Sequence, residues 1–168
     1  MQSAFTEDQF SKLLEEHKGI IYTIANSYCR NVEDRKDLIQ EIVLQIWKSY
    51  DRYDERFKLS TWIYRIALNV AISAYRREQR RTERISPLDE IIIEPATETE
   101  KPDPRVATLY QIIDQLHEMN RALMILYLSD NSYREIAAIL GITETNVATK
   151  INRLKLRLKE QFNEINPD

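Results

Sequence analysis

The sequence predicts an all-α protein with two helical domains, an acidic proline-rich linker between them and a helix-turn-helix in the C-terminal domain. Three observations support this fold class. Apolar residues recur at helical spacing in most segments. No segment alternates between apolar and polar residues as a strand does. The 168 residues include only 2 Gly and 5 Pro. Because Gly and Pro interrupt helices most strongly, their scarcity favours long helices.

The N-terminal part of the chain predicts two short helices and a longer one. Its beginning, "TEDQF", offers Thr6 as an N-cap with Gln9 three residues later, which is the capping-box pattern. We expect this helix to end before Gly19, a second helix to cover residues 20–30 and a third to cover residues 34–50. The third places five apolar residues on one stripe, which are Ile39, Ile42, Val43, Ile46 and Tyr50.

A polar loop, "DRYDERFKL", precedes the longest predicted helix. We expect Ser60 to cap this helix and the helix to extend at least to Arg77. Its inward face is expected to hold Ile63, Ile66, Ala67, Val70 and Ala74. A second stripe is polar and basic, and consists of Arg65, Asn69, Ser73, Arg76 and Arg80.

The end of the long helix, "YRREQRR", has a net charge of +3 from four Arg and one Glu. Aromatic residues gather before and beside it, namely Tyr50, Tyr53, Phe57, Trp62, Tyr64 and Tyr75. Arginines next to exposed rings suit single-stranded nucleic acid, because unstacked bases lie on the rings and cations neutralise the backbone. An equally good interpretation places the rings in the core and leaves the arginines to solvate the helix end.

Residues 83–104, "ERISPLDEIIIEPATETEKPDP", lack helical periodicity. They hold seven acidic residues, two basic residues and four of the five prolines, which predicts an extended, self-repelling linker. The linker separates predicted domains of residues 1–82 and 105–168, whose net charges are +2 and zero, so it accounts for the negative charge of the chain. Its apolar triplet Ile91–Ile93 fits either a local patch on a domain or a docking segment for a partner.

The C-terminal domain is expected to begin with helices over residues 105–118 and 120–129 and to end in a helix pair, "SYREIAAILGITETNVATKINRLK". In this pair Ser132 starts a capping box, Gly141 stands where a left-handed residue ends the first helix, and Thr143 caps the second. The first helix is expected to bury Ile136, Ala137 and Leu140. The second is expected to bury Val147, Ile151, Leu154 and Leu158.

The outer face of the last helix is polar and cationic. It presents Asn146, Thr149, Lys150, Arg153 and Arg157. The ten residues that start at Lys150 include five basic residues and no acid. An apolar inner face, a tight turn and a cationic outer face are typical of a helix-turn-helix that binds DNA. A helical hairpin with a solvated outer face is the alternative, and the basic run favours DNA.

Several kinds of site are not predicted. His17 and His117 lie far apart, without Cys or acidic residues at ligand spacing, so we expect no metal or other cofactor. No nucleophile motif appears, which argues against an enzyme with a small-molecule substrate. Cys29 is the only cysteine, so no internal disulfide is possible, and this fits a reducing cytoplasm. The acidic N-terminus is unlike a signal peptide, and no apolar run is long enough to insert into a membrane, so we expect a cytoplasmic protein.

Three blocks occur in order: "DLIQEIVLQIWKSY", "STWIYRIALNVAISAYRREQRR" and, after the acidic linker, "YREIAAILGITETNVATKINRLKLRL". Each block alone is moderately specific, and the ordered set is strongly so. From about Phe10 to Leu158 the chain resembles the extracytoplasmic-function (ECF) sigma factors, two-domain bacterial transcription initiation factors. The resemblance implies an RNA polymerase sigma factor, not an enzyme, that binds core polymerase and recognises −10 and −35 promoter elements. A free-standing helix-turn-helix repressor is the alternative.

The resemblance, with the outward residues noted above, implies three groups of site residues. The group that docks on the large polymerase subunits is Asp37, Leu38, Gln40, Glu41, Leu44, Gln45 and Trp47. The group that opens and reads the −10 element is Phe57, Lys58, Trp62, Arg65, Asn69, Ser73, Arg76, Arg77 and Arg80, and Asn69 matches a residue that helps to read a flipped base. The group that reads the −35 element is Thr145, Asn146, Ala148, Thr149, Lys150, Asn152, Arg153 and Arg157.

The sequence departs from the family pattern at some contact positions. Ser73 stands where many relatives carry Asp, Ala148 where many carry a basic residue, and Lys150 where Arg is frequent. Lys cannot reproduce the bidentate geometry of Arg, so these departures leave the promoter sequence open. The resemblance further implies an anti-sigma factor as a partner and a linker that threads toward the polymerase active centre.

Overall fold

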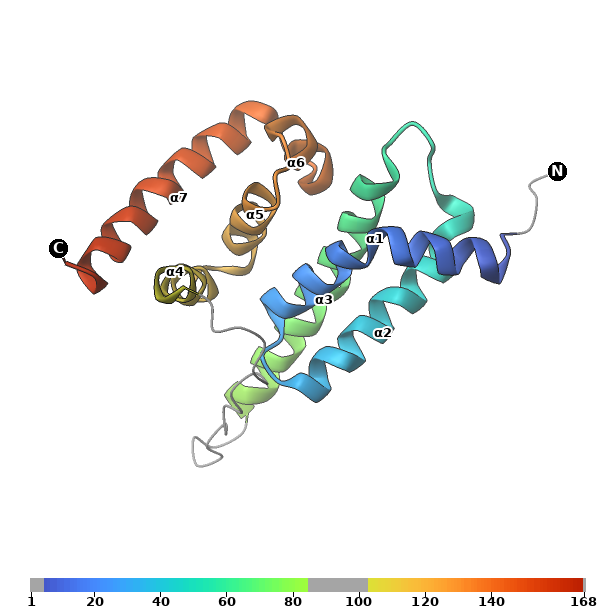
Figure 1. Cartoon of the computed structure of the whole chain (residues 1–168), viewed down its shortest axis with the longest axis horizontal. Coiled ribbons are helices and arrows are strands. Elements are labelled where there is room, and N and C mark those ends of the chain that lie inside the picture. Colours follow the sequence, from blue (N-terminus) through green and yellow to red (C-terminus); the bar gives the residue numbers. More distant parts are fainter. Residues whose placement is uncertain (1–4, 85–102, 168) are drawn as a thin grey trace. The chain divides into compact units, whose positions relative to one another are not determined.

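The chain divides into two compact units, Met1–Glu94 and Pro95–Asp168. The structure is a computed structural model that describes residues 5–84 and 103–167 (Figure 1). Within these ranges all regular structure is helical, which confirms the predicted all-α class. Nearly all of the predicted linker, with its triplet Ile91–Ile93, lies outside the described residues.

The first unit packs three α-helices against one another. They are α1 (Glu7–Tyr28), α2 (Val32–Ser49) and α3 (Leu59–Arg84), and the short 3-10 helix η1 (Tyr50–Arg52) follows α2. Each α-helix lies beside the other two (Figure 1). Their apolar stripes meet in one core. The core side chains are Leu13, Ile21, Ile24, Ala25, Tyr28, Leu38, Ile42, Ile46, Ile63, Tyr64, Ala67, Leu68, Ala71 and Ile72.

Helix α1 is longer than the sequence predicts. The capping box of Thr6 and Gln9 is present, but the helix continues through Gly19 to Tyr28, so the predicted break and separate second helix are wrong. A glycine inside a helix costs about 0.5–1 kcal/mol relative to alanine. Ile21 and Ile24 beyond it are buried, and burial of one such side chain stabilises by about 1.5–3 kcal/mol, which outweighs that cost.

Helix α3 differs from the prediction at its start and on its buried face. It begins at Leu59, so Ser60 lies inside its first turn and is not its cap. Of the five residues expected to face inward, Ile63 and Ala67 are buried, whereas the other three, Ile66, Val70 and Ala74, are half-buried. Because both α1 and α2 pack on α3, its buried face is wider than one stripe and includes Tyr64, Leu68, Ala71 and Ile72.

The second unit consists of α4 (Pro104–Asp114), α5 (Glu118–Leu128), α6 (Tyr133–Leu140) and α7 (Glu144–Ile165), and α7 contacts each of the other three. Both of its first helices end earlier than predicted.

The buried Arg121 donates from its guanidinium to the main-chain oxygens of Asp114 and Leu116. It thereby satisfies carbonyls that the end of α4 leaves without a helical partner.

The predicted turn of the helix-turn-helix is confirmed. Ser132 forms its capping box with Glu135, Gly141 adopts a left-handed conformation with φ 69°, and the hydroxyl of Thr143 accepts from the amide of Asn146. On α6, Ile136 and Ala137 are buried as expected. Leu140 is only half-buried, and Ile139 lies in the core in its place.

Candidate nucleic-acid interface

Helix α7 has one buried and one exposed face. Val147, Ile151, Leu154 and Leu158 are buried, as the sequence predicted. The residues predicted to read the −35 element all lie away from this stripe. Thr145, Asn146, Thr149, Lys150, Asn152, Arg153 and Arg157 are exposed, and Ala148 is half-buried. The structure therefore gathers this group on the accessible side of one helix, where polar and cationic side chains can meet base edges and phosphates.

One cation of the basic run has a partner within its own unit. The ammonium nitrogen of Lys155 lies 4.3 Å from the centre of the Tyr127 ring. The hydrogen bond with Tyr127 raises the pKa of Lys155 above its ordinary value. Lys155 thus remains charged at neutral pH and interacts with α5, and it does not belong to the predicted reading face.

A groove between α2 and α3 brings together much of the predicted −10 group. Its volume is about 500 Å³, and α3 lines it with Ile66, Asn69, Val70, Ser73, Arg76, Arg77 and Arg80. Glu41 and Gln45 line it from α2, and both belong to the predicted polymerase-docking group. Three guanidinium groups against one carboxylate make the groove cationic. Asn69 is exposed there with an amide that can both donate and accept.

The remaining residues of the −10 group gather at the N-terminal end of α3. We call residues 53–58 the recognition loop. Its Phe57 ring is 38% exposed and lies 4.6 Å from the guanidinium carbon of Arg65. The hydroxyl of Tyr53 donates to the main-chain oxygen of Phe57 at 2.7 Å. Lys58 is exposed and Trp62 is half-buried, so this end presents a ring and cations together.

The recognition loop also contains a close ion pair. The guanidinium of Arg56 donates to both carboxylate oxygens of Asp54, at 3.0 and 2.7 Å. The backbone amide of Arg56 donates to the same carboxylate at 3.0 Å. These hydrogen bonds from Arg56 hold the pKa of Asp54 below its ordinary value, because they favour the ionised form.

The predicted polymerase-docking group lies on α2, and the assignment of one of its members to an exposed surface is wrong. Leu38 is 5% exposed and packs in the core of the unit, so it cannot contact a partner. Leu44 and Trp47 are 50% and 40% exposed and stand three positions apart on α2, so they are neighbours on its outer side. The polar members Asp37, Gln40, Glu41 and Gln45 are exposed as well.

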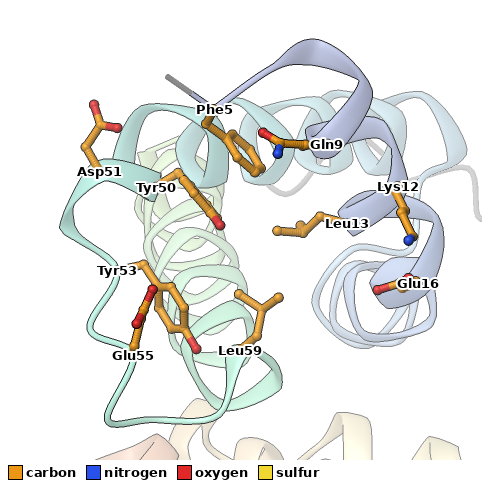
Figure 2. Close-up of a pocket in the computed structure, with 10 residues that line it drawn as sticks. All are labelled: Phe5, Gln9, Lys12, Leu13, Glu16, Tyr50, Asp51, Tyr53, Glu55 and Leu59. Atoms are coloured by element: carbon orange, nitrogen blue, oxygen red, sulfur yellow. The ribbon is translucent and has the colours of Figure 1, made fainter. Parts of the chain in front are cut away.

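The sequence analysis missed one feature of this unit. An open hollow of about 570 Å³ lies between α1 and the segment from η1 to the recognition loop (Figure 2). The hollow is lined from α1 by Gln9, Lys12, Leu13 and Glu16. It is lined from the other side by Tyr50, Asp51, Tyr53, Glu55 and Leu59, and of these Asp51 points its carboxylate away from the hollow (Figure 2). Phe5 lies at the edge of the hollow. Only the folded packing brings these distant segments together, so the sequence carried no local signal for the hollow.

Residues 5–84 and 103–167 contain no group of three or more His, Cys, Asp or Glu side chains that could hold a metal ion. None of their helices is both long and apolar enough to cross a membrane.

Comparisons with known proteins identify the family. The Sigma-70 region 2 model matches residues 13–81 and the Sigma-70, region 4 model matches residues 107–158, which together span most of the chain. The chain is 27% identical to the ECF RNA polymerase sigma factor SigW of Bacillus subtilis, over 95% of this chain and 91% of that protein. The chain belongs to the ECF sigma factors. This ECF sigma factor is also 27% identical to the RNA polymerase sigma factor SigV of Bacillus subtilis, over 85% of each chain.

Solved structures agree with this family at the level of the fold. CnrH, in complex with the cytosolic domain of CnrY, matches 95% of this chain and 90% of its own with a TM-score of 0.70. RpoE of Bartonella quintana, in complex with the anti-sigma factor NepR, matches 96% and 99% with a TM-score of 0.73. Both are 21% identical to this ECF sigma factor. The family matches make the chain an RNA polymerase sigma factor, and the alternative of a free-standing repressor is not favoured.

Proposed function

We propose that this sigma factor holds core RNA polymerase through its first unit, captures the melted −10 element with the same unit and anchors on the −35 element with its second. The observation that supports this division is the presence of two cationic surfaces on separate units, the α2–α3 groove and the outer face of α7. A repressor that binds only duplex DNA would need one such surface.

The −35 element is duplex DNA, and a helix can enter its major groove. On α7, Arg153 and Asn152 are placed to meet base edges, since Arg forms bidentate pairs with guanine and Asn with adenine. Lys150 and Arg157 are placed to meet phosphates, which fixes the register of the helix on the duplex. Ala148 offers a small apolar surface of the kind that contacts a thymine methyl group.

The −10 element is read after the strands separate. We assign the ring of Phe57 and the exposed part of Trp62 to stacking on unpaired bases, and the amide of Asn69 to hydrogen bonding with a flipped base. Arg65, Arg76, Arg77 and Arg80 supply positive charge for the strand backbone. Unstacking a base costs a few kcal/mol, and the new stacking and hydrogen bonds offset that cost.

We assign polymerase binding to the exposed side of α2. Leu44 and Trp47 provide apolar contact, and the acidic and amide side chains around them provide a polar rim, as in a typical protein interface. Leu38 does not belong to this surface, because it is buried in the core of the unit.

We further propose that the factor works in the cytoplasm without enzymatic activity of its own and that an anti-sigma factor restrains it. Support comes from the two structural neighbours, since RpoE is bound to the anti-sigma factor NepR and CnrH to the cytosolic domain of CnrY. The two family matches lie on either side of residues 83–104, which supports the predicted linker between the two domains.

Transcription in vitro with core polymerase and a library of random promoters tests the proposal. We expect transcripts only when the factor is added, and selected promoters with two conserved elements separated by a fixed spacer. A matched reaction without core polymerase measures DNA binding alone, which we expect to be weak. Tight binding to palindromic DNA without polymerase, and no promoter-specific transcript with it, would contradict the proposal.

A further inference from the structure

Phe5 makes a close ring contact with η1. Its ring stacks on the ring of Tyr50 with 3.6 Å between centroids and 14° between planes. Phe5 precedes α1 and lies outside residues 13–81, which the Sigma-70 region 2 model matches. The capping box at Thr6 fixes the backbone next to it. The first described residue of the chain is therefore held against a segment that lies 45 positions further along.

The contact continues from Tyr50 into the recognition loop. The Tyr50 ring lies 6.0 Å from Trp62 and 6.2 Å from Tyr53, and Tyr53 lies 5.2 Å from Trp62. Tyr53 then donates from its hydroxyl to the main-chain oxygen of Phe57 at 2.7 Å. A continuous series of contacts thus links Phe5 to the backbone of the residue whose ring we assign to base capture.

Because of the hollow, the position of the recognition loop depends on the contact between Phe5 and Tyr50. Figure 2 shows the side chains of Lys12 and Glu16 on one side of it and those of Tyr53 and Glu55 on the other, with Phe5 and Tyr50 together at one end. Side chains that face each other across an open space lend one another little packing support. The position of the loop therefore depends on contacts at the edges of the hollow, and the stack of Phe5 on Tyr50 is one of them.

We propose that Phe5 is a positioning residue for the recognition loop: by stacking on Tyr50 it holds the tyrosine that binds the Phe57 backbone, and so sets how selectively the loop captures its −10 base. This inference rests on the proposed role of the loop in −10 recognition. An aromatic pair suits this task, because each ring is rigid and buries a large apolar area in a defined orientation. Phe5 itself is not assigned to touch DNA.

The first experiment measures the loop without DNA, by NMR hydrogen exchange in the full chain. The amide of Phe57, which donates to the carbonyl of Asp54 at 3.1 Å, reports the loop, and core amides such as those of Ile24 and Ile42 report overall stability. We expect Phe5→Ala to speed exchange at Phe57 by roughly twofold to tenfold, the range that corresponds to one aromatic pair. Core amides should change less.

Two further variants of Phe5, and one of an aromatic residue outside the cluster, separate the effect of ring stacking from that of apolar volume. Phe5→Tyr keeps a ring and should restore slow exchange at Phe57, whereas Phe5→Leu keeps only apolar volume and should not. Tyr22→Ala is the matched control, because Tyr22 is an aromatic residue of α1 that is 50% exposed and does not line the hollow. If Tyr22→Ala loosened the loop as much as Phe5→Ala did, or if Phe5→Leu restored it, the inference would be overturned.

The second experiment measures base selectivity in transcription by the holoenzyme. Promoters that differ only at the captured −10 base are compared as a ratio, which a uniform loss of folded protein would not change. We expect Phe5→Ala to lower this ratio by roughly twofold to tenfold and Phe5→Tyr to restore it. An unchanged ratio despite a loosened loop would overturn the inference. If Phe57→Ala also left the ratio unchanged, the proposed role of the loop would fail as well, which distinguishes the two failures.

Discussion

The carboxylate of Glu41 on α2 accepts a hydrogen bond from the guanidinium of Arg77 on α3 at 3.3 Å, across the groove that the two helices form. Glu41 belongs to the proposed polymerase surface and Arg77 to the proposed −10 group. The two surfaces therefore share an ion pair. The side chains are 49% and 61% exposed, so the pair is well solvated and contributes only about 0–1 kcal/mol to stability.

Arg77→Gln should therefore separate function from folding. We expect the free energy of unfolding in urea to change by less than about 1 kcal/mol, because the lost pair is exposed. Promoter opening should weaken, because the groove loses one of its cations. Arg81→Gln is the matched control, since Arg81 pairs with Glu78 on the same helix and does not line the groove. Equal effects of the two substitutions on promoter opening would contradict a specific role of the groove.

Asn69→Ala should weaken promoter opening more than polymerase binding. The side chain is exposed in the groove, so its loss leaves no buried group unsatisfied and the unit should stay folded. Permanganate reactivity of thymines in the −10 element measures opening, and fluorescence anisotropy of labelled sigma factor measures affinity for the core enzyme. Gln79→Ala is a suitable control, because Gln79 is exposed on the same helix outside the groove. A parallel loss of polymerase affinity in Asn69→Ala would refute the assignment.

Alanine substitutions of Arg153 and Lys150 on α7 should change DNA binding in different ways. Arg153→Ala should weaken binding to the preferred −35 sequence by roughly 1–3 kcal/mol and relax selectivity at one base, if it makes a bidentate base contact. Lys150→Ala should weaken binding about equally on all sequences and lower the salt dependence, as loss of a phosphate contact does. Holoenzyme binding to −35 variants at several salt concentrations measures both effects. Unchanged binding in Arg153→Ala would mean that another face of α7 meets the DNA.

The ion pair in the recognition loop gives a prediction about pH. Hydrogen bonds from Arg56 lower the folded-state pKa of Asp54, so the pair is present above the ordinary aspartate pKa and is lost as the pH falls through the lowered value. Carbon-detected NMR titration should show that the pKa of Asp54 lies below the ordinary aspartate value. Arg56→Gln should raise its pKa toward the ordinary value of about 3.9. A titration of Asp54 that Arg56→Gln does not change would contradict the pair.

The sequence predicted the features that depend on a few neighbouring residues. The caps at Thr6, Ser132 and Thr143 and the left-handed Gly141 follow from rules that link residues three or four positions apart, and all are present. The exposed face of α7 could also be predicted, because a single strong stripe leaves only one orientation for the helix.

Features that depend on packing between helices could not be read in the same way. Leu38 was assigned to a partner surface, but it is buried because α2 turns the stripe of Leu38, Ile42 and Ile46 toward α1 and α3. Ile39 and Val43, which the sequence placed on the inner stripe, are only half-buried. The contact of Phe5 with Tyr50 joins segments far apart in the chain, and nothing within a local window indicates it. Continuation of α1 through Gly19 likewise depends on the core that the later helices provide.

The two glycines of the chain should respond oppositely to alanine. Gly19 lies inside α1, where no atom would come within 4 Å of an added Cβ. Alanine also restricts the unfolded chain, so Gly19→Ala should stabilise the first unit by about 0.5–1 kcal/mol. Gly141 has equally open surroundings, but its φ is +69°, and a non-glycine residue there costs about 1–2 kcal/mol. Gly141→Ala should therefore destabilise the second unit.

Urea unfolding of the full chain, followed by NMR signals of each unit, measures both changes at once. Gly141→Asn provides a matched comparison, because asparagine tolerates the left-handed region better than alanine and should lose less stability. Since no neighbouring atom opposes a side chain at either position, the opposite signs would arise from backbone conformation alone. A loss of stability in Gly19→Ala would mean that α1 is not continuous there, and a gain in Gly141→Ala would mean that the turn does not require a left-handed residue.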